Sequence, residues 1–436
     1  MSMMNFIHPP DFKELTRDKK IEKSPIPKKV TLPLSQHTGA PSEPCVKVGD
    51  IVKRGALIAK SKGFISSNIH SSVSGKIIAI EEAPHPALAS FQAITVESDE
   101  LDTQAFSDVT QDVSELSRGE IIDIVKEAGV VGLGGAAFPT HVKFNPPKGK
   151  DIDTLIINGA ECEPFLTCDH RLMIEHSKEI LFGIYLIADV LGVKNIIIGV
   201  EENKLDAIEE LGNALFKVRR DVYKVKVVKL KTRYPQGGEK QLIKTLLNRE
   251  VPSGGLPLDI GCVVNNVQTV FAVYEAVYRR KPLYERVITV SGKFLKEPKN
   301  VLVRIGTPIR DVLAFCGLDE KQDIYKIVMG GPMTGMAQFN LDAPVVKGTS
   351  GILVLDKRFE FPEEINCIRC SRCIDACPAG LMPCMIGIGV KNNRFDIAKM
   401  YDPFDCIECG SCSYICPSNI PLVQRIKLAK LELRKK

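Results

Sequence analysis

The sequence contains no uncharged apolar run of about 18 residues or more, the length that a membrane-spanning helix requires. Its longest apolar candidate, from Ile180 to Leu191, is short and is broken by Asp189. The N-terminus also lacks the basic stretch followed by an apolar stretch that marks a secretory signal. We therefore expect a cytoplasmic protein that reaches a membrane only through a partner.

Histidine is scarce, and none of the seven histidines forms a close pair with metal-ligand spacing. We assign these residues no chemistry. The apolar fraction of 44% and the charged fraction of 25% are those of ordinary globular proteins, so disorder is not expected. A chain of 436 residues exceeds one ordinary core and favours three or four domains.

Cysteine, in contrast, is abundant, and its spacing is informative. Eight of the 14 cysteines fall in two short runs with the repeated spacing x2, x2, x3, each followed by proline. The runs are Cys367, Cys370, Cys373 and Cys377, and then Cys406, Cys409, Cys412 and Cys416. Such spacing is typical of metal ligands in a reducing compartment rather than of disulfides in a secreted protein.

Three closely spaced thiolates can bind three irons of one 4Fe-4S cluster, while the fourth cysteine of the run binds the neighbouring cluster. The first predicted set is therefore Cys367, Cys370, Cys373 and Cys416, and the second is Cys377, Cys406, Cys409 and Cys412. Zinc also binds Cys-x2-Cys pairs, but a zinc site does not explain the repeated run of four. Cys384 lies close to the runs and has no required role.

The rest of the chain divides into three regions with different sequence patterns. Short alternating runs up to about residue 110 predict strands and turns, and they resemble the barrel-sandwich domains that carry biotin or lipoyl groups, without an attachment lysine. From about 118 to 280, apolar runs alternate with helical stretches such as His170 to Leu191, which predicts a parallel sheet with crossover helices. Residues 285–355 predict a small α+β domain. Ligands of parallel sheets lie at the carboxyl ends of the strands.

A glycine-rich segment begins the middle region, with Gly132, Gly134, Gly135 and then Lys143. Glycines let backbone N–H groups approach an anionic or planar ligand, and a lysine supplies positive charge for a phosphate. Alone this signal is weak. Three further polar segments follow it: Asn158, Glu161, Cys162 and Glu163; Tyr234, Gly238 and Glu239; and Asn265, Asn266 and Thr269.

These segments, in this order, resemble those of the flavin- and NADH-binding subunit of respiratory complex I. The resemblance implies that the glycine loop and the asparagines surround FMN, and that the acidic and aromatic residues shape the nicotinamide site. Two positions depart from that pattern, because Ala160 and Lys240 stand where the family has acidic residues. No catalytic side chain is assigned, since hydride would pass through FMN.

The whole order of segments resembles the RnfC family of the Rnf electron transport complex. It implies a multidomain α/β fold with a barrel-sandwich domain (1–110), a Rossmann-like FMN and NADH domain (111–284), a β-grasp domain (285–358) and a two-cluster ferredoxin-type helical module (359–436). It also implies a peripheral subunit on the cytoplasmic side of a membrane, exchanging electrons between NAD(H) and a ferredoxin-linked carrier. Ion translocation would belong to the other subunits of the complex.

The number of electrons that each cofactor exchanges supports this interpretation independently. Nicotinamides exchange two electrons as hydride and clusters pass one, so a flavin is needed between them. Two clusters and a flavin phosphate, each near −2, would bring the formal charge of +5 close to zero, so nucleic acid is not an expected partner. Two alternatives stay open: a soluble flavin and iron–sulfur reductase for a cobalamin enzyme or another acceptor, and a non-catalytic scaffold that only relays electrons.

Overall fold

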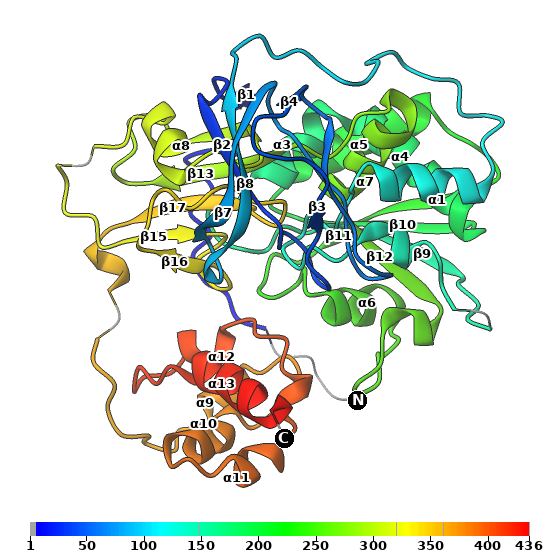
Figure 1. The fold of residues 1–436 in the computed structure, drawn as a ribbon. Coiled ribbons are helices and arrows are strands. Elements are labelled where there is room, and N and C mark those ends of the chain that lie inside the picture. The colour runs from blue at the N-terminus through cyan, green and yellow to red at the C-terminus, as the bar shows by residue number, and fades with distance from the viewer. Residues whose placement is uncertain (1–5, 148, 320, 361, 436) are drawn as a thin grey trace.

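The computed structural model describes residues 6–435 except 148, 320 and 361. Figure 1 shows a large body of sheets and helices and, below it, a smaller helical module formed by the C-terminal residues. The chain between them, residues 362–371, contains no helix or strand. The predicted multidomain α/β class is confirmed.

The middle region of the chain contains a four-stranded sheet in the order β11-β10-β9-β12, and all of its strand pairs are parallel. Its strands are β9 (Thr154–Gly159), β10 (Asn195–Glu201), β11 (Lys224–Leu230) and β12 (Cys262–Asn266). Leu155 and Ile157 of β9 face one core, whereas Ile156 faces a second core with Leu242 and Ile243. Because both faces are covered, the central strands read as continuous apolar runs, as predicted.

Seven helices of the described residues belong to this region. They are α1 (Arg118–Glu127), α2 (Thr140–Lys143), α3 (Cys168–Glu175), α4 (Ser177–Leu191), α5 (Leu205–Lys217), α6 (Glu239–Leu247) and α7 (Val267–Arg279). The run predicted from His170 to Leu191 is two helices, because His176 leaves helical geometry with φ −133° and ψ 34°. The helix α4 packs directly against α7, where a Cβ on Gly183 would lie 2.4 Å from the carbonyl oxygen of Val270.

The N-terminal region is rich in β-structure, as expected. Its two sheets have the orders β2-β8-β7-β4 and β3-β5-β6. The strands are β2 (Lys29–Pro33), β3 (Glu43–Pro44), β4 (Ile51–Val52), β5 (Leu57–Lys60), β6 (Ile69–His70), β7 (Gly75–His85) and β8 (Ala89–Ser98). The preceding strand β1 (Ile21–Lys23) does not join them, because it pairs with β14 of the next sheet.

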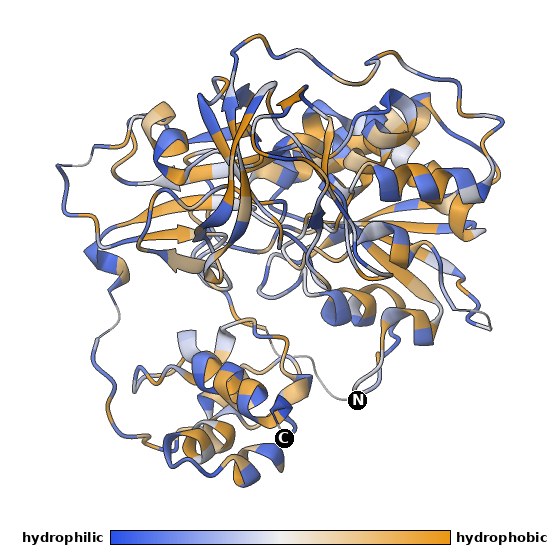
Figure 2. Cartoon of the chain, viewed as in Figure 1, coloured by the Kyte–Doolittle hydropathy of each residue, from blue (hydrophilic) through white to orange (hydrophobic). Residues whose placement is uncertain are grey.

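Residues 285–355, joined by β1 from the N-terminal segment, form a mixed six-stranded sheet in the order β1-β14-β13-β17-β15-β16. It contains β13 (Glu285–Gly292), β14 (Lys299–Arg304), β15 (Lys326–Met329), β16 (Met336–Gln338) and β17 (Gly351–Leu355), with helix α8 (Ile309–Phe315). A separate core holds this domain together, with Ile288, Val301, Ile309 and Leu313 all fully buried. Apolar residues dominate the strands of this sheet and of the parallel sheet (Figure 2).

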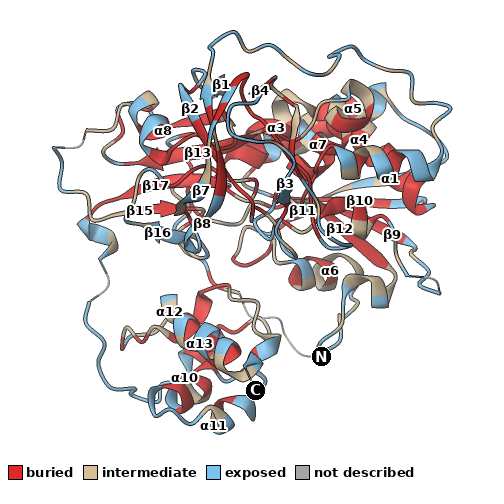
Figure 3. Cartoon of the chain, in the orientation of Figure 1, coloured by how far each residue is buried: buried red, intermediate tan, exposed pale blue. Residues whose placement is uncertain are grey.

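The C-terminal module consists of short helices around a small core of its own. They are α9 (Arg372–Asp375), α10 (Pro383–Lys391), α11 (Phe395–Lys399), α12 (Ser411–Tyr414) and α13 (Leu422–Arg434). Ile386 of α10, Ala398 of α11 and Ile426 of α13 are buried together, while much of the outer face of the module is exposed (Figure 3). Within the described residues, every helix is too short or too polar to cross a membrane.

Candidate functional site

The cysteines of the C-terminal module line two cavities. The first cavity is lined by Cys367, Cys370, Cys373 and Cys416, together with Cys384. The second cavity is lined by Cys377, Cys406, Cys409 and Cys412. This is the division that the cysteine spacing predicted, with the last cysteine of each run on the side of the other run.

Short helices place the fourth cysteine of each run in the cavity of the other run. Helix α9 carries Cys373 and ends at Asp375, so that Cys377 follows two residues later and lines the other cavity. Helix α12 repeats the arrangement with Cys412 and Cys416. A 4Fe-4S cluster needs four thiolate donors, and each cavity offers them, with Cys384 as a fifth thiol in the first cavity, so the residues present fit two clusters.

The second cavity lies against the body of the protein. The Tyr234 hydroxyl donates a hydrogen bond of 2.6 Å to the carbonyl oxygen of Cys409, and both residues are buried. A Cβ on Gly410 would lie 2.7 Å from the carbonyl oxygen of Met333. Ile7 completes the contact, because its backbone exchanges hydrogen bonds of 2.8 and 2.9 Å with Tyr234. The first set, in contrast, has two exposed members, Cys367 and Cys370.

The predicted glycine loop lies beside the end of β12 and the start of α7. The N–H group of Leu133 donates to the Thr269 hydroxyl at 2.9 Å. A Cβ on Gly134 would come within 3.2 Å of the Asn266 Cβ. Gly135 has φ +112°, and a Cβ there would meet no atom of the described residues within 4 Å. The loop therefore packs tightly at Gly134 and opens at Gly135, where only glycine adopts the backbone without strain.

The two asparagines at the end of β12 have different surroundings. The Asn266 amide donates to the Asp169 carboxylate at 2.6 Å, and its oxygen accepts from the Gln268 N–H at 2.9 Å, which caps α7. The side-chain nitrogen of Asn265 is buried and has no hydrogen-bond partner among the described residues. Because buried donors are almost always satisfied, Asn265 has a donor that is available to a bound group.

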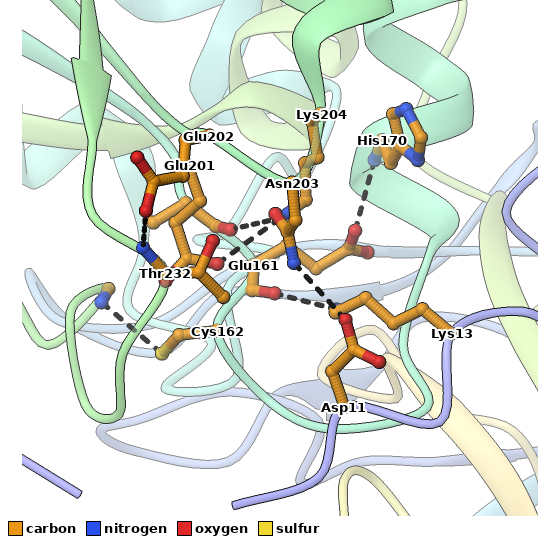
Figure 4. Close-up of polar contacts among 12 residues, drawn as sticks. Asp11, Lys13, Glu161, Cys162, His170, Glu201, Glu202, Asn203, Lys204 and Thr232 are labelled. Atoms are coloured by element: carbon orange, nitrogen blue, oxygen red, sulfur yellow. Dashed lines mark hydrogen bonds and ion pairs between the residues drawn. The ribbon is translucent and has the colours of Figure 1, made fainter. Parts of the chain in front are cut away.

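The acidic loop, residues 160–166, joins β9 to α3 and is drawn in Figure 4. Both oxygens of the Glu161 carboxylate accept backbone N–H groups of Asp169 and His170, at 2.7 and 3.1 Å. The Glu163 carboxylate accepts from the backbone N–H of Met333 at 3.1 Å, and burial raises its pKa. Both carboxylates are therefore engaged by the protein itself.

Cys162, on the same loop, contacts the segment that precedes α6. Its sulfur accepts a hydrogen bond of 3.2 Å from the backbone N–H of Gly237, and burial raises the pKa of the thiol. Asn158 donates to the carbonyl oxygen of the same glycine at 2.8 Å. The carboxyl end of β9 and the loop before α6 are thus held together.

Lys143 and Glu239 come from different helices, α2 and α6, and meet at 3.0 Å. Lys143 also donates to the carbonyl oxygen of Val264 on β12, at 3.0 Å. Gly238 is the residue before α6 and places Glu239 in the first turn of that helix. Lys240 instead reaches toward the Pro252 carbonyl oxygen and does not join this pair.

Matches to protein families cover most of the chain. Residues 1–101 match the RnfC barrel sandwich hybrid domain, 125–275 the Nuo51 FMN-binding domain, 287–337 the SLBB domain and 366–420 the 4Fe-4S dicluster domain. A Clostridium ljungdahlii protein, named as a component of a proton-translocating ferredoxin:NAD(+) oxidoreductase complex, is 49% identical over 98% of this chain and 93% of its own. The chain belongs to the RnfC family.

Other members of the RnfC family are similar over comparable lengths. The counterpart from the Na(+)-translocating complex of Acetobacterium woodii is 44% identical over 98% of this chain and 96% of its own. The counterpart from the ion-translocating oxidoreductase complex of Rhodobacter capsulatus is 43% identical over 99% and 83%. Among solved structures, an NAD+-reducing [NiFe]-hydrogenase shares the fold, with a TM-score of 0.51 and 20% identity over 74% of this chain and 62% of the hydrogenase chain.

Two residues that the sequence analysis of this RnfC-family chain did not predict hold the glycine loop and its neighbours in place. Asp169 accepts from the amides of Asn266 and Gln268, the latter at 2.9 Å, and burial, followed by the charge of Glu161, raises its pKa to about 6. Arg286 on β13 donates to the carbonyl oxygen of Leu133 at 3.1 Å, and burial lowers its pKa to about 10. Asp169 follows the acidic segment in the sequence and could have been found there, but nothing in the sequence marks Arg286.

Proposed function

We propose that the chain is an NADH-linked oxidoreductase subunit that exchanges electrons between NAD(H) and ferredoxin-linked partners. It does so with FMN and two 4Fe-4S clusters, inside a membrane complex whose other subunits translocate ions. The observation that carries the proposal is the direct contact of the second cysteine set with the body, through Tyr234 and Cys409. An electron relay needs its groups close together, and this contact joins the flavin domain to the cluster module.

The residues around the glycine loop support an FMN site. The open space at Gly135 and the unpaired donor of Asn265 fit a planar ligand with hydrogen-bond acceptors, and Lys143 supplies a positive charge nearby. When bound, the flavin would take hydride and release single electrons. Asn266 acts differently from Asn265, because its amide is used to cap α7 and to bind Asp169.

The remaining predicted residues form the rim of this site. Asn158, Cys162, Gly238 and Glu239 fix the position of the loop before α6. Thr269 fixes the position of the glycine loop. Glu161 and Glu163 hold α3 and the Met333 turn in place, which keeps the acidic loop beside the strand ends. A nicotinamide would be bound by this loop as a whole.

The two cysteine sets differ in which side of the module they face. The second set faces the body, and Cys367 and Cys370 of the first set are exposed. An external acceptor or donor can therefore approach the first set. We place the protein at the cytoplasmic side of the membrane, bound to the other subunits of the complex. Co-purification with integral-membrane proteins supports this placement, and isolation as a free reductase that serves another acceptor contradicts it.

Anaerobic purification with iron, sulfide and flavin quantified together tests the proposal. We expect about eight irons and about one FMN per chain, and oxidation of NADH with ferricyanide as the acceptor. Gly134→Val should lose flavin and keep iron, because its side chain would collide with Asn266. The matched control is Gly212→Val on α5, where a Cβ meets nothing within 4 Å. Intact clusters without flavin in the wild-type protein would contradict the proposal and favour a relay scaffold.

A further inference from the structure

The acidic loop has an unusual backbone. Glu161 has φ +45° and Phe165 has φ +66°, and neither is a glycine. Side chains disfavour this left-handed region, so the loop needs contacts that hold it there. Two buried lysines provide such contacts, one on each side of the loop (Figure 4).

Lys204 lies between β10 and α5 and is 1% exposed. Its ammonium group donates to the carbonyl oxygen of Ala160 at 2.7 Å, to the side-chain oxygen of Asn203 at 2.9 Å and to the Glu201 carboxylate at 3.3 Å. An ammonium group has three donors, and all three are therefore used. The charge of Glu201 pairs with that of Lys204.

Lys13 approaches the loop from the N-terminal segment and is 4% exposed. It donates to the carbonyl oxygens of Glu161 at 2.8 Å and Glu163 at 3.0 Å, and also to that of Leu166. No carboxylate is among these three partners. The main-chain oxygens of the loop are thus turned inward, toward the ammonium groups of the two lysines.

The residues beside Lys13 fasten the same loop. Phe12 stacks on Phe165, with ring centroids 4.8 Å apart. The N–H group of Phe165 donates to the carbonyl oxygen of Asp11 at 2.7 Å, and the hydroxyls of Thr16 and Thr167 are 2.7 Å apart. The segment from Asp11 to Thr16 therefore packs directly on the acidic loop.

Burying two ammonium groups close together is unfavourable. Burial lowers the pKa of Lys13, and the neighbouring charge of Lys204 lowers it further. Apolar side chains would fill the same space without this cost. The ammonium group of Lys13 instead binds three carbonyl oxygens of one loop, which is a contact that apolar side chains cannot make.

We propose that Lys13 and Lys204 are positioning residues of the nicotinamide site, which hold the acidic loop in the conformation that binds NAD(H). The inference rests on the proposed function, since the loop carries Glu161 and Glu163. Among the described residues, neither lysine hydrogen-bonds to the glycine loop or to Asn265. Loss of a lysine should therefore impair nucleotide binding while flavin and iron stay bound.

Lys13→Met in the full chain tests this, with Lys13→Arg as the variant that keeps the charge and Lys20→Met as the control. Lys20 is exposed in the same segment. For Lys13→Met we expect normal flavin and iron content, a KM for NADH raised about tenfold and a much smaller change in kcat with ferricyanide. Lys13→Arg should fall between Lys13→Met and the wild type, and Lys20→Met should match the wild type. If Lys13→Met does not fold, Lys13→Gln replaces it, with the same expectation.

Hydrogen exchange of the peptide containing residues 160–166 gives a readout that needs no cofactor. We expect faster exchange in Lys13→Met and an unchanged rate in Lys20→Met. The positioning role is overturned if Lys13→Met exchanges this peptide at the wild-type rate. It is also overturned if Lys13→Met, folded and loaded with flavin, keeps the wild-type KM for NADH. A wild-type protein that does not oxidise NADH refutes the proposed function instead, and the exchange result then still reports whether Lys13 holds the loop.

Discussion

Tyr234→Phe removes a single oxygen atom from the contact between the body and the cluster module. In the structure that oxygen donates a hydrogen bond of 2.6 Å to the carbonyl of Cys409. Tyr234 is 3% exposed, so water cannot easily replace the lost donor. A buried carbonyl left without a partner costs about 1–3 kcal/mol. The equilibrium for separating the module from the body should therefore shift by about 5- to 150-fold toward separation.

Hydrogen exchange measures this shift directly. The backbone N–H groups of Ile7 and Tyr234 bond to each other's carbonyl oxygens at the contact and should lose protection by that factor. The amide of Ile156, in the middle of the parallel sheet, should keep its protection. Tyr274→Phe is the control, because the Tyr274 hydroxyl forms no hydrogen bond within the described residues. Equal protection in Tyr234→Phe and the wild type would show that the hydroxyl does not hold the module.

Two further predictions concern stability. Gly183→Ala should lower the urea midpoint of the body, because the new Cβ would overlap the Val270 carbonyl. The free energy of unfolding should fall by about 1–3 kcal/mol or more. A midpoint equal to that of the wild type would mean that α4 shifts without cost. Burial lowers the pKa of Lys347 to about 7, where its ammonium donates to the carbonyl oxygens of Asn68 and Gly129 at 2.6 and 2.7 Å. The unfolded chain keeps its proton to higher pH, so the free energy of unfolding should rise from about pH 7 to about pH 10, and Lys347→Met should abolish that rise in urea titrations.

The sequence was most informative where function depends on local spacing. The spacing of the two cysteine runs predicted how their eight thiols divide between the two cavities, because a helical turn carries the last cysteine of a run to the other side. The parallel sheet was also predictable, since strands buried on both faces must be apolar throughout. Strand β1 was not, because its pairing with β14 joins residues that are far apart in the chain.

Around the flavin site, residue types were predictable and their individual roles were not. Asn265 and Asn266 are neighbours of identical chemistry, and only the fold shows that Asp169 binds the amide of Asn266. Lys13 and Arg286 act from other segments, at sequence distances over which no periodicity extends. Their contacts arise from packing between domains, which a pattern within one segment cannot record.

The different exposure of the two cysteine sets has a consequence for damage. Oxidants and chelators reach Cys367 and Cys370 from solvent, whereas Cys409 and Cys412 are covered by protein. Iron loss should therefore begin at the outer set and leave the inner set for longer. A damaged molecule would still exchange electrons between the nucleotide and the inner set, but it would lose exchange with an external partner first.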